Sequence, residues 1–151
     1  MSKLPSKRSL ADFTPPELPD LPDPRRLHEA TDNLNAVLVE AEKALADLKL
    51  GVSAYVTLDE SDDGWFRVLL FAKSGRDFKL LIQTGHEHDE TAGETTVLTS
   101  ASRETRLQAV EALPKLYRKL VKEFEAEIER VKTSITEVQQ LTQAIRAKGG
   151  K

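Results

Sequence analysis

The hydrophobic positions of this chain repeat with two different periods, and the change of period separates helical segments from strand segments. In residues 23–50, apolar residues recur at alternating steps of three and four, which is the spacing of a heptad seam on one face of a helix. Asp23 and Pro24 suit the start of this helix, and Gly51 suits a C-terminal cap. The seam consists of Leu27, Ala30, Leu34, Val37, Ala41, Ala44 and Leu48.

Residues 52–100 have the composition and period of strands. The stretches VSAYVTL, WFRVLLFAK, FKLLIQT and TTVLTS are rich in β-branched or aromatic residues, and DESDDG, SGRD and GHEHDETAGE separate them. This pattern predicts a four-stranded antiparallel meander. The second stretch is apolar on both sides, so we expect both sheet faces to be covered. Under the cover of the second face we expect Trp65, Leu69 and Phe71.

Residues 102–148 return to helical spacing. Ser102 is a suitable N-cap, and Pro114 removes one backbone hydrogen bond, which predicts a kink or a break at that point. From Tyr117 a second seam follows strict three-and-four steps, with Thr142 as its polar exception, and Gly149 and Gly150 end the helix. The apolar members of this seam are Val121, Phe124, Ile128, Val131, Ile135, Val138 and Ile145.

These elements predict an α+β fold of order α-β-β-β-β-α. A meander with an even number of strands starts and ends at the same edge, so we expect the two long helices to form an antiparallel coiled-coil hairpin. The alanines of the first seam bury little area, which makes such a hairpin marginal and favours a homo-oligomer, most simply a dimer. The residues expected to carry assembly are Leu34, Val37, Ala41, Phe124, Ile128, Val131, Ile135 and Val138.

The order of one long helix, four strands and another long helix resembles the layout of α-type prefoldin subunits, whose paired helices project from a β platform. It also resembles small dimeric nucleoid-associated proteins built as helix, sheet and helix. The resemblance covers residues 24–148 in topology and carries over no individual residue. It implies a role in binding other macromolecules, although a fold alone does not determine a function.

The prolines divide the chain into an arm and a body. Six of the seven prolines lie within the first 24 residues, a density that favours extended backbone. We therefore expect residues 1–22 to form a flexible Pro-rich arm and residues 23–151 to form a single domain. The pattern leaves open whether the arm docks on the body or on a partner.

Composition restricts the classes of function. The chain has 151 residues, a net charge of −3 and no cysteine, which excludes disulfides, thiolate metal sites and a cysteine nucleophile. No apolar run reaches the ~18 residues that a membrane helix needs, and MSKLPSKRSLADF has no apolar segment typical of a secretory signal. We therefore expect a cytoplasmic protein without membrane contact.

Acidic residues and two histidines gather in the predicted turns. DESDDG and GHEHDETAGE join alternate hairpins, so they should lie at the same end of the sheet and form an acidic rim. His86, His88 and Asp89 are candidate ligands for a transition metal, if the second turn is ordered. A charged, mobile hairpin tip or an electrostatic contact with a basic partner are the alternatives. DESDDG matches a calcium loop only in part, because Leu70 stands where the bidentate glutamate belongs.

No catalytic pattern is present. The chain lacks a Gly-rich phosphate loop, a G-x-S-x-G elbow and an H-E-x-x-H motif, so we expect no enzyme, no cofactor and no small-molecule substrate. The best interpretation is a non-catalytic protein–protein interaction or assembly module, of an adaptor, regulatory or chaperone-like kind.

A basic stretch supports an alternative function. Between residues 103 and 122, six basic residues outnumber two acidic ones, and a dimer would present this stretch twice to the phosphates of a nucleic acid. The same residues suit the solvated outer face of an amphipathic helix. The possible nucleic-acid contacts are Arg103, Arg106, Lys115, Arg118, Lys119 and Lys122.

Overall fold

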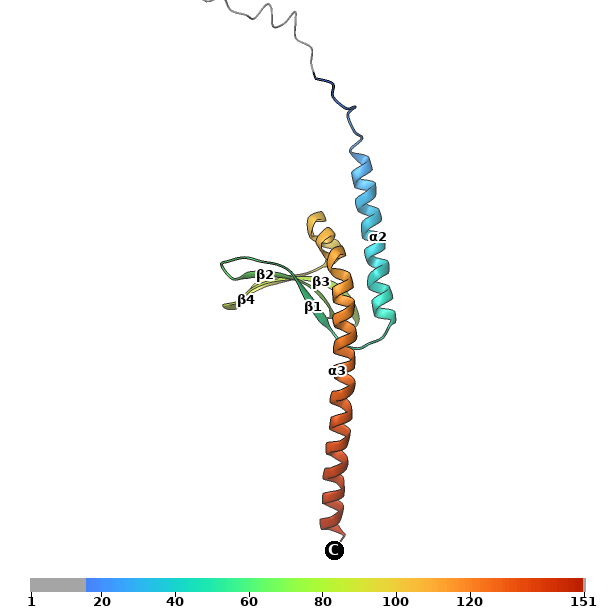
Figure 1. Ribbon diagram of the computed structural model, residues 1–151, viewed down its shortest axis with the longest axis vertical. Coiled ribbons are helices and arrows are strands. Elements are labelled where there is room, and N and C mark those ends of the chain that lie inside the picture. Colours follow the sequence, from blue (N-terminus) through green and yellow to red (C-terminus); the bar gives the residue numbers. More distant parts are fainter. Residues whose placement is uncertain (1–15, 151) are drawn as a thin grey trace, which may run out of the picture.

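The computed structural model describes residues 16–150, in which one antiparallel sheet carries two helices on the same face (Figure 1). The strand order is β1-β2-β3-β4, so the predicted four-stranded meander and the α+β order of the elements are confirmed. The elements are α2 (Arg25–Asp47), β1 (Ala54–Glu60), β2 (Trp65–Ser74), β3 (Asp77–His86), β4 (Asp89–Val97), the short 3-10 helix η1 (Leu98–Ser100) and α3 (Arg103–Gly149).

The ends of the helices follow their local sequences, with one correction. Ser102 caps α3 as predicted, because its hydroxyl accepts a hydrogen bond from the Thr105 amide at 3.2 Å. Helix α2 ends at Asp47, earlier than the expected residue 50. Its termination involves Lys49, whose φ of +52° is left-handed, so Gly51 is not the residue that closes the helix.

Most of the stretch GHEHDETAGE belongs to the sheet. Strand β4 begins at Asp89, and only Glu87 and His88 remain as a turn between β3 and β4. Gly93 permits the pairing, since its φ is +138° and an added Cβ would lie 2.2 Å from a backbone oxygen of β3. The turn is therefore shorter than the sequence predicted, and Gly85 and Gly93 pair across the two strands that it joins.

The hydrophobic core lies between the sheet and the two helices. Leu69 and Phe71 are 0% and 4% exposed beneath the helices, whereas Trp65 is 45% exposed at the end of the sheet. Leu69 and Phe71 are therefore covered as expected, and the cover consists of the two helices. The expectation that Trp65 is covered with them is wrong. The core consists of Leu38, Ala54, Val56, Leu69, Phe71, Leu80, Ile82, Leu98, Ala109, Leu116 and Leu120.

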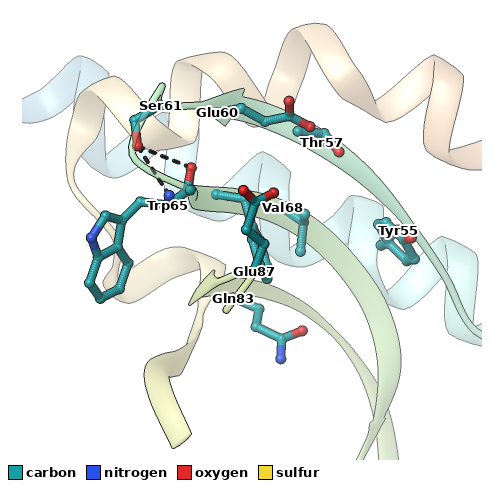
Figure 2. A pocket seen from close by; sticks show the side chains of 10 residues that line it. Tyr55, Thr57, Glu60, Ser61, Trp65, Val68, Gln83 and Glu87 are labelled. Carbon is teal, nitrogen blue, oxygen red and sulfur yellow. Dashed lines mark hydrogen bonds between the residues drawn. The ribbon is translucent and has the colours of Figure 1, made fainter. Parts of the chain in front are cut away.

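No element of residues 16–150 packs on the other sheet face, so the expectation of a second cover is not met within the described chain. Val68 and Leu81 of this face are nevertheless buried, and they lie in the two central, adjacent strands β2 and β3. The strands curve across this face (Figure 2).

Helices α2 and α3 run in the same direction, so the predicted antiparallel hairpin is wrong. Near the start of α3, Arg106 contacts Asn35 of α2, and further along Tyr117 lines a groove with Leu48. Figure 1 shows both helices descending side by side from the top of the molecule. An antiparallel pair would reverse the order of these contacts.

The end of β4 explains the direction of α3. The last residue of β4, Val97, pairs with Leu81 in the middle of β3, so the strand stops halfway along its neighbour. The chain then passes through the buried Leu98 to the start of α3, where Thr105 contacts Arg67 of β2. Because Arg67 pairs with Asp59 near the β1–β2 turn, α3 starts at that end of the sheet.

Helix α3 is continuous through Pro114, and a break there is wrong. Proline cannot donate to the carbonyl of Val110, but Val110 is exposed and water can reach this part of the helix.

Residues 124–149, called here the distal half of α3, extend beyond α2 and the sheet (Figure 1). Within residues 16–150, α3 continues past the end of α2 without a second helix beside it, so the likeness to the paired helices of prefoldin does not extend to this part. In residues 16–150, no helix has the length and apolar character to cross a membrane.

Candidate interaction surfaces

The distal half of α3 carries an exposed row of aliphatic side chains, which we call the distal seam. The exposed fraction rises along the helix from 37% at Ile128 to 49% at Val131, 51% at Ile135 and 60% at Val138 and Ile145. Helical spacing places these residues, together with Phe124, on one face. A contiguous apolar surface of this kind in contact with water marks a binding surface.

A groove between the two helices lies along α3 before the distal seam. It encloses about 550 Å³, and its walls are almost entirely apolar. Ala41 of the predicted assembly set lies here, whereas Leu34 packs against the core and Val37 is exposed. The groove is lined by Ala41, Ala44, Leu45, Leu48, Val110, Leu113, Pro114 and Tyr117.

A second hollow connects the body of the molecule to the distal seam. It has a volume of about 240 Å³, and Leu50 and Val52 face Phe124, Ile128 and Val131 across it. Leu50 and Val52 were not among the predicted assembly residues, because they follow α2 and belong to neither heptad pattern. Leu141, 60% exposed beside the distal seam, was missed because it lies one residue before the regular step at Thr142.

The open sheet face has a hollow of about 410 Å³ near the β1–β2 turn. Figure 2 shows Glu60, Glu87 and Gln83 around this open-face hollow, while the ring of Trp65 points away from it. The two carboxylates give this hollow a negative charge, while Tyr55 lies at its other end with the Lys119 ammonium over its ring. The sequence did not identify this hollow, because its lining comes from β1, β2, β3 and two turns.

The two acidic turns are neighbours, as the meander predicted. The amide of Glu87 donates to the carbonyl of Gly64 at 3.0 Å, and Nε2 of His86 lies 2.6 Å from the carbonyl oxygen of Asp63. The hydrogen bond of the Ser61 hydroxyl to Asp63 lowers the pKa of that carboxyl. The acidic rim is therefore an ordered pair of turns.

The predicted metal ligands are used for other contacts. Nδ1 of His86 accepts from the amide of His88 at 3.1 Å, so Nε2 carries the proton and donates to Asp63, and neither ring nitrogen remains for a metal. The carboxylate of Asp89 accepts from the amide and hydroxyl of Thr91, which lowers its pKa. Within residues 16–150, no three His, Cys, Asp or Glu side chains are grouped to hold a metal ion. The expected site at His86, His88 and Asp89 is therefore not formed.

The basic stretch is divided between structural and exposed residues. Arg106 is 9% exposed and donates to Asn35, and Lys119 donates to the backbone oxygen of Tyr55 at 3.2 Å with its ammonium over the Tyr55 ring. These two contacts hold α3 to α2 and to the edge strand β1. Nucleic-acid binding stays a prediction, now resting on the exposed side chains of Arg103, Lys115, Arg118 and Lys122.

No protein-family model, curated protein or solved structure matches this chain.

Proposed function

We propose that this protein is a non-catalytic interaction module that assembles with protein partners in the cytoplasm, as an adaptor, regulatory or chaperone-like component. The observation that carries the proposal is the distal seam. Its aliphatic side chains are about half exposed on the distal half of α3, which extends beyond α2 and the sheet. Burying such side chains contributes about 25 cal/mol for each Å² removed from water, so a partner surface gains stability by covering them.

The neighbouring hollows support the same proposal. The inter-helix groove and the hollow at Leu50 and Val52 follow one another along α3, and both are mainly apolar. They lead from the body of the protein onto the distal seam. An elongated apolar track of this kind fits a helix laid along it, which is a recurring mode of protein recognition.

The test is a double substitution in the seam, Ile135→Asp with Val138→Asp. Both residues are exposed and lie outside the core, so the body should fold as the wild type does. The matched control is Thr133→Asp with Gln140→Asp, which adds the same charge to the opposite face of the helix. Circular dichroism checks that each variant keeps its fold.

Two measurements then decide the outcome. Light scattering reports self-association, and affinity capture from a host lysate with mass spectrometry reports other protein partners. We expect the seam variant, and not the control, to lose at least one association that the wild type makes. If the wild type and the seam variant associate identically in both measurements, the proposed function is wrong.

A further inference from the structure

We propose that the distal half of α3 binds the same segment of a second copy in antiparallel orientation, forming a two-helix coiled coil. This inference rests on the proposed function and names the partner. Three observations carry it: the heptad positions of the seam, the length of helix outside the body, and the charges on both sides of the seam.

The seam has a regular heptad pattern. Steps of three and four place the Ile-rich set at the a positions and the Val-rich set at the d positions, and such a pattern favours a coiled coil. The a positions are Val121, Ile128, Ile135 and Thr142, and the d positions are Phe124, Val131, Val138 and Ile145. In an antiparallel pair, each a residue packs in a layer with a d residue of the other helix.

One antiparallel register uses the whole distal half. It places Ile128 opposite Ile145 of the second copy, Val131 opposite Thr142 and Ile135 opposite Val138. In the same register, Phe124 lies opposite Gly149, where the helix ends. Phe124, Ile128 and Val131 also border the hollow at Leu50 and Val52, so the first turns of the paired segment lie beside the end of the body. The overlap extends over about 39 Å at 1.5 Å per residue.

The flanking charges favour this register. Glu125 and Arg146 both occupy e positions and face each other across the pair, and Glu127 and Lys148 do the same at g positions. Two-fold symmetry makes each of these pairs twice. The acidic part of the helix near the body thus meets the basic part near the end of α3 in the other copy.

Other alignments lose these contacts. A shift by one heptad in one direction places Lys132 opposite Lys132 of the second copy and Arg118 opposite Arg146. A shift in the other direction places Lys132 opposite Arg146. Both shifts therefore bring like charges together. A parallel pair keeps a contact between Glu127 and Lys132 but leaves Glu125 without an opposite charge. Charges at e and g positions are the usual determinant of coiled-coil orientation.

The polar member of the seam is compatible with burial. The hydroxyl of Thr142 donates to the carbonyl of Val138 at 2.8 Å, so only its methyl group has to pack in the layer.

Glu127 lies 3.4 Å from Arg130 in a solvent-exposed pair of the same helix. Such exposed pairs contribute little, and the carboxylate can exchange this contact for Lys148 of the second copy at small cost.

The experiment reverses the charges at each end. Glu125→Lys with Glu127→Lys, and separately Arg146→Glu with Lys148→Glu, should each weaken dimerisation by about tenfold or more, measured by analytical ultracentrifugation. An equimolar mixture of the two variants should restore a dimer of wild-type affinity. Glu123→Lys with Glu129→Lys is the control, because it makes the same change of charge at outer positions and should leave the dimer intact.

Cysteine pairing tests the orientation, because the chain has no cysteine of its own. Under mild oxidation, Val131→Cys mixed with Thr142→Cys should form a heterodimeric disulfide. Dominant disulfides between two Thr142→Cys chains would instead indicate a parallel pair and overturn the inference. A wild type that stays monomeric, or charge variants that do not complement each other, would overturn it as well. If the wild type is monomeric but captures another protein through the seam, the inference fails while the proposed function stands.

Discussion

Arg106 near the start of α3 donates a hydrogen bond to Asn35 of α2 at 2.6 Å, joining residues 71 positions apart in the chain. Its guanidinium also lies 3.4 Å from the carbonyl of Ser102, and the residue is 9% exposed. The contact is polar, part-buried and specific, so it stabilises the parallel alignment of the two helices over the alternatives.

Asn35→Ala should therefore lower the free energy of unfolding by about 1–3 kcal/mol, because it removes an acceptor from a mostly buried charged group. Urea denaturation followed by circular dichroism measures the change. Asn33→Ala provides the control, since Asn33 is exposed on the same helix, and it should change stability by less than about 0.5 kcal/mol. Equal effects of the two substitutions would contradict the structural role of the contact.

Glu42 of α2 accepts a hydrogen bond from a backbone amide of β3 at a point where β4 no longer pairs with that strand. Beyond Val97, β4 no longer pairs with β3, and the amide of Leu80 donates to Glu42 Oε2 at 2.8 Å. We expect Glu42→Ala to destabilise the fold by about 1–2 kcal/mol and to accelerate hydrogen exchange of the Leu80 amide. Glu42→Gln, which keeps an acceptor, should retain most of the protection. An unchanged exchange rate in Glu42→Ala would show that the contact does not protect the amide.

Gly85 is required by the ring of Phe66. A Cβ at residue 85 would lie 2.6 Å from the nearest ring atom, and Gly85 is paired with Phe66 in the sheet. Gly85→Ala should cost about 1–3 kcal/mol through overpacking, and this cost should shrink in a Phe66→Ala background. Gly149→Ala is the control, because no atom lies within 4 Å of the added group. Thermal unfolding compares the four variants, and purely additive effects would exclude the proposed clash.

Asp89 should titrate below its ordinary pKa of 3.8, because the hydroxyl and amide of Thr91 donate to its ionised carboxylate. A lowered folded pKa means that the contribution of Asp89 to stability is present above the ordinary value and is lost as the pH falls through the folded value. In Thr91→Val, NMR titration should find the pKa closer to 3.8. Thr95→Val, on the same strand, should leave it unchanged, and a wild-type value at or above 3.8 would refute the assignment.

The local sequence was sufficient for several features of the fold. Heptad spacing, alternation and capping are interactions between residues close in the chain, and they predicted the helices, the four strands and the cap at Ser102. Meander connectivity also placed the two acidic turns together, because alternate hairpins necessarily lie at one end of a sheet.

The candidate surfaces were predicted only in part. The seam from Phe124 to Val138 followed from its spacing, but the sequence paired it with α2, and that pairing depended on the direction of α3. The metal hypothesis at His86 failed because ring nitrogens next to a tight turn form hydrogen bonds with the backbone. Composition alone does not reveal such contacts.

The sequence by itself therefore determined the number and order of the helices and strands, although not the bounds of β4, and it determined the apolar face that each helix presents. Only the tertiary structure decided the direction of α3, the sheet face that both helices cover, and the part of the seam that stays exposed. The physical reason is that these features depend on where β4 stops and where Leu98 is buried. Both result from contacts between residues distant in the chain, which the local spacing of hydrophobic residues does not specify.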